Sequence, residues 1–523
     1  MDKDLQSIQE VRELIQLAKQ AQLEYKHYSQ PQVDKIIKAM ADAGYTEAER
    51  LAKLAHEETG FGKWQDKVIK NQFGTKNVYE SIKDLKTVGV IGVEHNGKVV
   101  KIAEPMGVVA ALIPSTNPTS TVMFKAIISL KCRNAIVVSP HPKAVNCTFE
   151  SLKVLIKAAE AAGAPKGLIQ CLTTPTLPAT EELMKNKSVA VILATGSNPM
   201  VKAAYSAGTP AYGVGSGNVP AFIEKTANVQ KAVADIVSGT TFDNGTLCSS
   251  EQALIVDRPL KDKAIAEAKK LNCYFVDENE KLKLEKAVIK GGHINAEIVG
   301  KSAKFIAEYA GFNVPENTSA LIAYCDSVGR NEPLSMEKLS PVLAFYTVDG
   351  WLEGCHKCIE LLEFGGIGHT MAIHSNDKEV IMKFALEKPA FRIVVNTPSS
   401  LGAVGYTTML APSLTLGVGT WGGSIVSENV TAKHLMNIKT LAFETKAINE
   451  GYSVSSFEDS PKYSGEKRHG FQEEIEERLR ARAGNPVVSS FTPQGNKSAE
   501  SKKVFGSGIS SSEIDKIIKE FKS

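Results

Sequence analysis

The feature that most restricts the fold is a regular alternation of apolar runs with amphipathic segments, which begins at Gly107. The run 107–115 is followed by the helical pattern of 119–132, and the run 135–140 by that of 146–163. Continuous apolar runs are typical of strands buried on both faces, and strands that alternate with helices form parallel sheets. The sequence therefore predicts an α/β fold built on a doubly wound parallel sheet.

The alternation continues in two blocks, which indicates two α/β domains. Apolar runs at 167–173 and 189–197 extend the first block, and a second block runs from 250 to about 430. Ahead of both, residues 86–105 contain two β-rich runs around His95-Asn96-Gly97. Because Asn-Gly favours the primed turns of hairpins, this segment is predicted to be a β-hairpin outside the core that serves assembly.

Composition restricts the partners and the compartment. The 523 residues are 43% hydrophobic and 23% charged, with 61 basic and 58 acidic residues and a net charge of +3. This balance favours small-molecule partners and indicates neither nucleic acid nor an anionic membrane. The first residues lack the apolar core of a signal peptide, and no run reaches membrane-spanning length. We therefore expect a cytoplasmic protein whose eight cysteines are reduced.

The two ends of the chain each carry a candidate docking helix. Residues 484–511 are rich in Gly, Ser, Pro, Asn and Lys, which predicts a flexible linker before a short helix at 512–523. So short a helix is marginal alone, so it either docks on its own domain or fits a groove of another protein. Its apolar stripe consists of Ile514, Ile517, Ile518 and Phe521. The rival N-terminal helix has Leu5, Ile8 and Ile15 on its apolar side.

One cysteine stands in a context that differs from ordinary packing. The segment 242–256 places Cys248 at the tip of a glycine-containing loop, directly ahead of a predicted strand. A free cysteine usually packs as a small hydrophobe. A thiol on an exposed loop is also open to nucleophilic chemistry, so both interpretations apply to Cys248.

Two predicted strand ends are candidates for ligand contacts. In 194–208 a buried strand ends in Thr195-Gly196-Ser197 and leads into a helix that starts at Ser197. A helix N-terminus after a strand can bind a pyrophosphate, and the alternative is an ordinary capped helix. After the first core strand, Asn117 is placed to offer its amide NH2 to an oxyanion. The alternative for Asn117 is a turn residue before a proline.

Two further motifs carry weaker signals. The segment 417–422 matches G-x-G-x-x-G, but no acid follows at the ribose spacing, so it also fits a glycine-rich turn. The cysteines of 355–358, with His369 and His374, have a spacing similar to a zinc finger, although the middle spacer is short. The same cysteines fit one packed face of a helix, and neither charge nor spacing supports a zinc-dependent nucleic-acid binder.

Taken together, the ordered motifs resemble the aldehyde dehydrogenase superfamily over about residues 10–450. They are most similar to the CoA-acylating branch, which includes the N-terminal half of bifunctional aldehyde-alcohol dehydrogenases and the aldehyde dehydrogenases of bacterial microcompartments. The motifs are SQPQVDKI, EETGFGKWQDKVIKN, KTVGVI, AEPMGVVAALIPSTNPTST, ATGSNPMVKAAYSAGTPAYGVGSGNVPAFIE, TFDNGTLCSSEQ, EKLSPVLA, GGIGHTMAIHS and NTPSSLGAVG.

The resemblance implies a domain organisation that refines the α/β prediction. It implies an aldehyde dehydrogenase-like fold with a Rossmann-type NAD-binding domain, an α/β catalytic domain and a β-hairpin oligomerisation element. The implied parts are 1–85 and 104–235 for NAD binding, 236–430 for catalysis, 86–103 and 431–483 for oligomerisation and closure, 484–511 as linker, and 512–523 as an amphipathic encapsulation tail. A homodimer or tetramer is expected.

The resemblance also assigns roles to individual residues. It implies that Cys248 is the nucleophile and that Asn117 and the Cys248 backbone N–H hold the oxyanion. His369 is a motif residue that orients or deprotonates an incoming thiol, unless it is a structural histidine. The expected cofactor-binding residues are Pro114, Ser139, Thr195, Gly196, Ser197 and Glu337, the last contacting the nicotinamide ribose unless it is a surface carboxylate.

The function implied by the resemblance is oxidation of a short aldehyde with NAD through a thioester on Cys248. Hydrolytic relatives carry a base where this chain has Gly213 or its neighbours, and no acid occurs from 206 through 223. Coenzyme A is therefore the expected acceptor and acyl-CoA the product, and the alternative is a hydrolytic enzyme that releases the free acid. The segment 139–144 lacks the adenosine-ribose acid of classical relatives, which leaves NADP open.

The tail resembles the encapsulation peptides of microcompartment enzymes in its layout. That resemblance implies a location in the lumen of a bacterial microcompartment, a shell protein as partner of the C-terminal helix, and propionaldehyde or acetaldehyde as substrate. The alternative of a different class is a scaffold or shell-binding protein with a decayed site.

Overall fold

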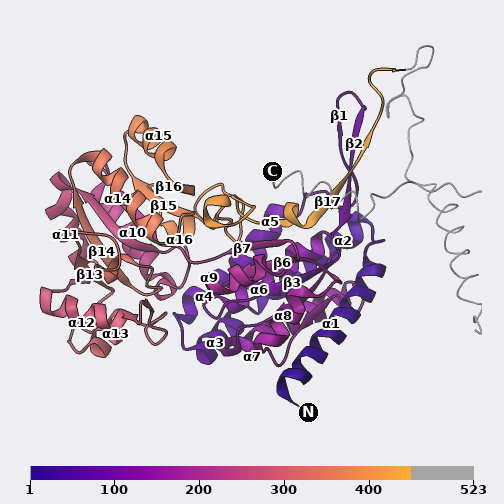
Figure 1. Cartoon of the computed structure of the whole chain (residues 1–523), viewed down its shortest axis with the longest axis horizontal. Coiled ribbons are helices and arrows are strands. Elements are labelled where there is room, and N and C mark those ends of the chain that lie inside the picture. The colour runs from indigo at the N-terminus through magenta and orange to yellow at the C-terminus, as the bar shows by residue number, and fades with distance from the viewer. Residues whose placement is uncertain (1, 449–523) are drawn as a thin grey trace, which may run out of the picture. The chain divides into compact units, whose positions relative to one another are not determined.

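The structure is a computed structural model that describes residues 2–448. Two parallel sheets, each covered by helices, form the body, and a long hairpin projects from it (Figure 1). The predicted linker at 484–511 and the predicted tail helix at 512–523 lie outside the described residues. Within residues 2–448, no helix has both the length and the apolar character needed to cross a bilayer.

The first sheet has five parallel strands and confirms the first predicted block. Its central strands are continuous apolar runs in which nearly every residue is buried, as expected for strands covered on both faces. Its order is β5 (Ile169–Cys171), β4 (Ala135–Ser139), β3 (Val108–Leu112), β6 (Val189–Thr195) and β7 (Ala211–Val214). Its crossover helices are α6 (Pro118–Lys131), α7 (Val145–Ala161), α8 (Leu177–Lys185) and α9 (Asn198–Tyr205).

The second sheet has seven parallel strands and confirms the second α/β block. Its order is β10 (Cys273–Phe275), β13 (Ala320–Tyr324), β14 (Val342–Val348), β9 (Glu251–Asp257), β8 (Val219–Ile223), β15 (Gly368–His374) and β16 (Ala390–Val395). Its helices are α10 (Val229–Thr241), α11 (Lys261–Lys270), α12 (Glu278–Val288), α13 (Ala303–Ala310), α14 (Gly350–Phe364), α15 (Lys378–Glu387) and α16 (Ser399–Gly402). A small ribbon, β11 (Ile289–Lys290) with β12 (His293–Ile294), follows α12.

The change from one sheet to the other falls earlier than the expected boundary at 235/236. Strand β8 and helix α10 belong to the seven-stranded sheet, so the chain crosses between β7 and β8. Near the other end, Ala403, Leu414 and Leu435 pack in the same core cluster as β3. The sequence placed all of 104–235 in one unit because the segment between β7 and β8 carries no helix to mark the crossing.

The N-terminal helices belong to the first core. In α1 (Lys3–Tyr25), Val11, Ile15 and Tyr25 are fully or almost fully buried in the cluster that contains β3, whereas Leu5 is 59% exposed. The Tyr25 hydroxyl donates to the Leu130 carbonyl oxygen at 3.1 Å. The face with Val11, Ile15 and Tyr25 is therefore occupied in the core, whereas Leu5 stays exposed, so the rival docking role of this helix stays a prediction. It is followed by α2 (Gln30–Thr46), α3 (Ala48–Thr59), α4 (Trp64–Gln72) and α5 (Val78–Ile82).

The predicted hairpin is present and is extended by a distant strand. β1 (Gly89–Glu94) pairs with β2 (Val99–Pro105), and β17 (Met436–Ala442) pairs antiparallel with β2. His95, Asn96 and Gly97 have φ of 51°, 51° and 79°, the left-handed values that a primed turn requires. The role of this three-stranded ribbon in oligomerisation stays a prediction.

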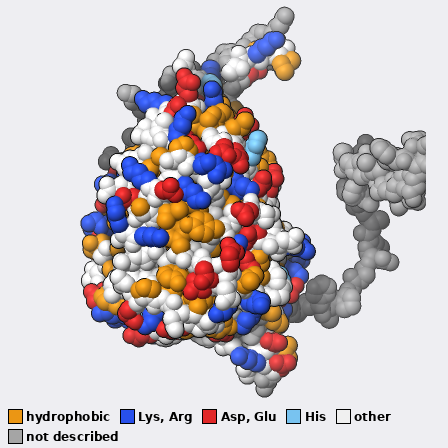
Figure 2. All heavy atoms as spheres, turned by 90° about the vertical axis from the view of Figure 1, so that its left-hand side faces the viewer, with side chains coloured by type: hydrophobic (Ala, Val, Ile, Leu, Met, Phe, Trp, Pro, Cys, Tyr) orange, Lys and Arg blue, Asp and Glu red, His pale blue; other side chains and the backbone are white. Residues whose placement is uncertain are grey.

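The surface view agrees with the balanced composition. On the face shown in Figure 2, acidic and basic side chains are interspersed with small apolar groups. A field of one sign would be needed to attract a polyanion, so this face offers nucleic acid no such attraction.

The core of the first sheet depends on α6, and one substitution tests this. Phe124 on α6 is fully buried, so Phe124→Ala should lower the free energy of unfolding by about 3–5 kcal/mol. Leu386→Ala, at a side chain that is 80% exposed, should change it by less than about 0.5 kcal/mol. Urea unfolding followed by circular dichroism measures both, and equal stabilities would contradict the packing described here.

Candidate active site

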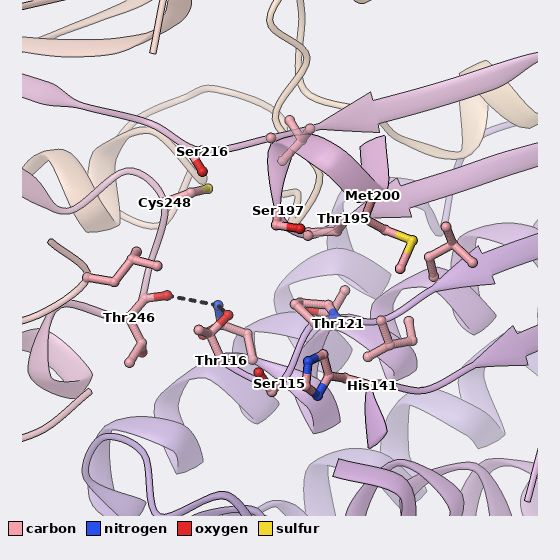
Figure 3. A pocket seen from close by; sticks show the side chains of 18 of the residues that line it. Ser115, Thr116, Thr121, His141, Thr195, Ser197, Met200, Ser216, Thr246 and Cys248 are labelled. Carbon is pink, nitrogen blue, oxygen red and sulfur yellow. Dashed lines mark hydrogen bonds between the residues drawn. The ribbon is translucent and has the colours of Figure 1, made fainter. Parts of the chain in front are cut away.

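One cavity of about 570 Å³ brings together strand ends from both sheets (Figure 3). From the five-stranded sheet it is lined at the carboxyl ends of β3, β4 and β6. Strand order in this sheet reverses between β3 and β6, the place where open α/β sheets bind ligands. The opposite wall contains the loop 246–249, which precedes β9.

The predicted pyrophosphate segment lies in this wall. Thr195 ends β6, Gly196 follows, and Ser197 occupies the N-cap position of α9, and all three line the cavity. The Ser197 side chain makes no capping hydrogen bond, in contrast to an ordinary capped helix. It is therefore available, together with the backbone N–H groups of α9, to an anionic ligand.

Pro114 and Ser139 also line the cavity, at the ends of β3 and β4. Ser139 is buried, and its hydroxyl is 2.9 Å from that of Thr180. Beyond Ser139, the cavity wall continues through His141 and Lys143. The β4 end thus presents a hydroxyl, an imidazole and an ammonium group and no carboxylate, as the sequence of 139–144 indicated.

Cys248 is the one cysteine of the eight that is partly exposed, and it opens into the cavity. Burial, followed by the nearby Glu337 carboxylate, raises the pKa of its thiol to about 12, and the Arg392 guanidinium and the backbone N–H groups of Cys248 and Ser249 oppose this shift. Packing is therefore the correct interpretation for the other seven cysteines, whereas Cys248 packs against the first core cluster and also lines the cavity. Those seven are Cys132, Cys147, Cys171, Cys273, Cys325, Cys355 and Cys358.

Asn117 lies beside the loop that carries Cys248. It is the N-cap residue of α6, and its side-chain Nδ2 donates to the Thr246 carbonyl oxygen at 3.1 Å and to Thr116 Oγ1 at 3.1 Å. Figure 3 shows the bond to Thr246 as a dashed line between the two walls of the cavity. The predicted oxyanion donor and the predicted nucleophile are thus brought to one site.

Glu337 is the one carboxylate among the described residues that line the cavity. Its Oε1 accepts from the Gly217 backbone N–H at 2.9 Å, and burial raises its pKa to about 7. Its second oxygen is buried and has no protein partner among the described residues. These contacts exclude the surface-carboxylate interpretation and leave one oxygen for a ligand.

His369 lies behind the cavity wall rather than in it. The ring is fully buried, its Nδ1 is 3.0 Å from Thr370 Oγ1, and burial together with Arg392 lowers its pKa to about 3. A Cβ on Gly217 would overlap the Cys248 carbonyl oxygen and lie 3.1 Å from the His369 ring. His369 is therefore neutral and lies against Gly217, as the Cys248 carbonyl group does, and its action on an incoming thiol stays a prediction.

Sequence reasoning missed the cation that favours the thiolate form of Cys248, which is Arg392. Arg392 on β16 is buried, and its guanidinium donates to the carbonyl oxygens of His369 at 3.0 Å, Ser427 at 3.2 Å and Gly417. Burial lowers its pKa to about 10, and the nearby Cys248 opposes this shift. The signal was a single arginine inside the otherwise apolar strand AFRIVV, because buried charges are rare.

The two weaker motifs have structural roles. Cys355 and Cys358 lie on α14 and are buried against the sheet, while His369 and His374 lie on β15. No three His, Cys, Asp or Glu side chains within 2–448 are grouped to hold a metal ion. The segment 417–422 forms a turn that ends in a short 3-10 helix, so it is a glycine-rich turn and not a dinucleotide fingerprint.

The profile described as "Aldehyde dehydrogenase family" matches residues 4–310, more than half of the chain. The chain belongs to the aldehyde dehydrogenase family. Two relatives indicate the branch of this family. The bifunctional aldehyde-alcohol dehydrogenase of Escherichia coli is 44% identical over 441 residues, 83% of this chain and 50% of that protein. The succinate-semialdehyde dehydrogenase (acetylating) of Clostridium kluyveri is 38% identical over 450 residues, 86% of this chain and 98% of that protein.

The chain spans about half the length of the first of these relatives, whereas it spans solved family members almost completely. An acetylating aldehyde dehydrogenase from Geobacillus thermoglucosidasius superimposes with a TM-score of 0.85 at 52% identity, covering 86% of this chain and 99% of that one. A propionaldehyde dehydrogenase from a Clostridium phytofermentans microcompartment gives 0.76 at 27%, covering 83% and 97%. That of Rhodopseudomonas palustris, solved with CoA and an acylated cysteine, gives 0.74 at 27%, covering 83% and 96%.

The opposed charges around Cys248 lead to a prediction for this family member. Because the Glu337 carboxylate raises the pKa of the thiol, Glu337→Gln should speed its alkylation by iodoacetamide severalfold. The effect should be present at about pH 8.5, where Glu337 is ionised, and absent at about pH 5.5, where it is protonated. Quench-flow alkylation followed by mass spectrometry measures the rate.

The labelling pattern provides the control for this experiment. The native chain should take up one label, which Cys248→Ser removes, and the unfolded chain should take up eight. A slower reaction in Glu337→Gln at the higher pH would contradict the electrostatic assignment.

Proposed function

We propose that this chain is a CoA-acylating aldehyde dehydrogenase that oxidises a short aldehyde with NAD and releases acyl-CoA. The observation that carries the proposal concerns Cys248, the single partly exposed thiol. It opens into the cavity at the carboxyl ends of the five-stranded sheet, beside the Asn117 amide. The acetylating relatives and the acylated cysteine of a solved family member support the branch.

The residues in the cavity fit a nicotinamide nucleotide. Thr195, Gly196 and Ser197 present the N-terminus of α9 to a pyrophosphate, and Glu337 has a free carboxylate oxygen for a ribose hydroxyl. Pro114 and Ser139 complete this side of the wall. When bound, the cofactor supplies the hydride acceptor.

The residues on the other wall perform the covalent chemistry. The Cys248 thiolate, favoured by Arg392, forms a bond to the aldehyde carbon, and the carbonyl oxygen becomes an alkoxide. Asn117 Nδ2 and the Cys248 backbone N–H donate to that alkoxide. The alkoxide replaces one of the two present acceptors of Nδ2, the Thr246 carbonyl oxygen or Thr116 Oγ1. Loss of hydride from the same carbon leaves a thioester on Cys248.

The fate of the thioester depends on whether a base activates water, and the base position of hydrolytic relatives is closed in this chain. A Cβ on Gly213 would lie 2.7 Å from Val201 Cγ1 and 2.7 Å from the Tyr205 hydroxyl, so no acidic side chain fits where hydrolytic relatives have one. A thiolate needs no such base, and thioester exchange is nearly balanced in energy, which favours coenzyme A as acceptor.

Hydrolysis to the free acid is the second candidate because one observation favours it. Glu337 lines the same cavity and has a pKa of about 7, a value suited to a general base for water. Its contact with Gly217 and the resemblance to a ribose-binding acid argue for the other role.

The finer parts of the proposal concern location and substrate. We place the enzyme in the cytoplasm, inside a microcompartment whose shell protein binds the 512–523 helix, with propionaldehyde or acetaldehyde as substrate and a homodimer or tetramer as the assembly. The layout of linker and tail and the microcompartment origin of one solved relative support this. The scaffold alternative predicts no turnover at all.

A burst experiment distinguishes the two acceptors. With propionaldehyde and NAD alone, we expect one NADH per active site and then no further turnover, because the thioester has no acceptor. Added coenzyme A should convert the burst into sustained turnover. Stopped-flow absorbance of NADH measures both phases.

The control is Cys248→Ala, which should lose both phases by on the order of 10⁴-fold or more while keeping its circular dichroism spectrum. Sustained turnover without coenzyme A, if lost in Glu337→Gln, would establish the hydrolytic enzyme instead.

Deletion of 485–523 tests the encapsulation role separately from catalysis. The truncated chain should keep its turnover with coenzyme A, because none of the residues proposed for catalysis lies in the deleted segment. It should no longer co-purify with shells when co-expressed with shell proteins, whereas the full chain should. Equal co-purification of both chains would rule out the tail as the tag.

A further inference from the structure

Two lysines share one buried carboxylate directly beneath Asn117. Lys67 and Lys70 are one helical turn apart on α4, and both contact Asp243 Oδ2, Lys67 at 2.9 Å and Lys70 more closely. All three side chains are at most 4% exposed. Burial lowers the pKa of Lys70 to about 8, and the Asp243 and Asp66 carboxylates oppose this shift, so Lys70 is protonated at neutral pH.

The two lysines differ in what else they touch. Lys67 donates to the Thr116 backbone carbonyl oxygen at 3.2 Å. Lys70 donates to the side-chain oxygen of Asn117, Oδ1, and lies 3.4 Å from Thr246 Oγ1. An ammonium group has only donors, so it fixes which end of an amide faces it. With Oδ1 held by Lys70, the Nδ2 of Asn117 must point the other way, toward the Thr246 carbonyl oxygen.

The same carboxylate also holds the loop of the nucleophile. Asp243 Oδ2 accepts from Thr246 Oγ1 at 2.8 Å, and Asp243 Oδ1 accepts from the Lys63 backbone N–H at 2.6 Å. Thr246 is two residues before Cys248. Lys70 and Asp243 therefore connect the Asn117 amide with the loop that presents the thiol.

We propose that Lys70 is a positioning residue, which holds Asn117 Oδ1 so that the Asn117 NH2 group faces the carbonyl oxygen of the bound aldehyde. This inference rests on the oxyanion role that the proposed function gives to Asn117. Without Lys70, only the Thr246 carbonyl and the Thr116 hydroxyl hold the orientation of the amide, and an amide rotated by half a turn presents its oxygen, which repels an alkoxide. Lys67 reaches the same carboxylate without touching Asn117, so it does not hold the amide.

The test compares Lys70→Met with the matched control Lys67→Met. Each variant removes one of the two cations from Asp243, and only the first frees the Asn117 amide. Lys70→Met should lower the burst rate of NADH formation about 10- to 100-fold without changing KM for NAD, since loss of a whole oxyanion donor costs about 100- to 1,000-fold. Lys67→Met should stay within about threefold of the parent enzyme.

A double-mutant cycle separates positioning from general structural support. In the Asn117→Ala background, Lys70→Met should lower the burst rate by less than about twofold further, because its effect acts through the missing amide. An equal loss in both backgrounds, or equal losses in Lys70→Met and Lys67→Met, would overturn the proposal. Lys70→Gln, which keeps an N–H donor, should recover part of the rate and serves as the test if Lys70→Met does not fold.

The cycle also distinguishes the two levels of inference. If Asn117→Ala is slow and both Lys70 variants are as fast as the parent enzyme, only the positioning role of Lys70 is wrong. If Asn117→Ala itself has the burst rate of the parent enzyme, the oxyanion role in the proposed function is wrong, and the Lys70 inference falls with it.

Discussion

The carboxyl ends of strands from one sheet face the amino ends of strands from the other sheet across the cavity, and the chemistry depends on this arrangement. The groups proposed to bind the nicotinamide nucleotide lie at the carboxyl ends of β3, β4 and β6. Cys248 and Glu337 instead precede the amino ends of β9 and β14. A single parallel sheet presents only one kind of end at each edge, so one sheet alone could not place both sets together. The extended crossing from β7 to β8 provides the second sheet within the same chain.

Within this frame, the electrostatics of the thiol are balanced between opposing groups. Burial and Glu337 disfavour the thiolate, and Arg392 and two backbone N–H groups favour it. Glu337 can lose its charge near neutral pH, whereas Arg392 cannot. The reactivity of Cys248 is therefore set by its neighbours more than by its own side chain.

The sequence was sufficient for features that are local. Buried strands such as β3 and β4 appear as continuous apolar runs, the hairpin turn depends on adjacent residues, and the resemblance placed Cys248 and Asn117, which the cavity brings together. Contacts made over long separations carry no local pattern. Lys70 and Asp243 are far apart in the sequence, and i, i+3 lysines on a helix ordinarily indicate a solvated face.

The backbone of the loop that presents Cys248 also restricts which residues can occupy the positions before it. Asp243, Asn244 and Gly245 have φ of 48°, 53° and 71°, three successive residues in the left-handed region, directly before the Thr246 turn. Only Gly, Asn and Asp adopt that region readily, and other residues incur a cost of about 1–3 kcal/mol each. Substitutions other than Gly, Asn or Asp at these three positions should therefore destabilise the loop, although none of the three lines the cavity.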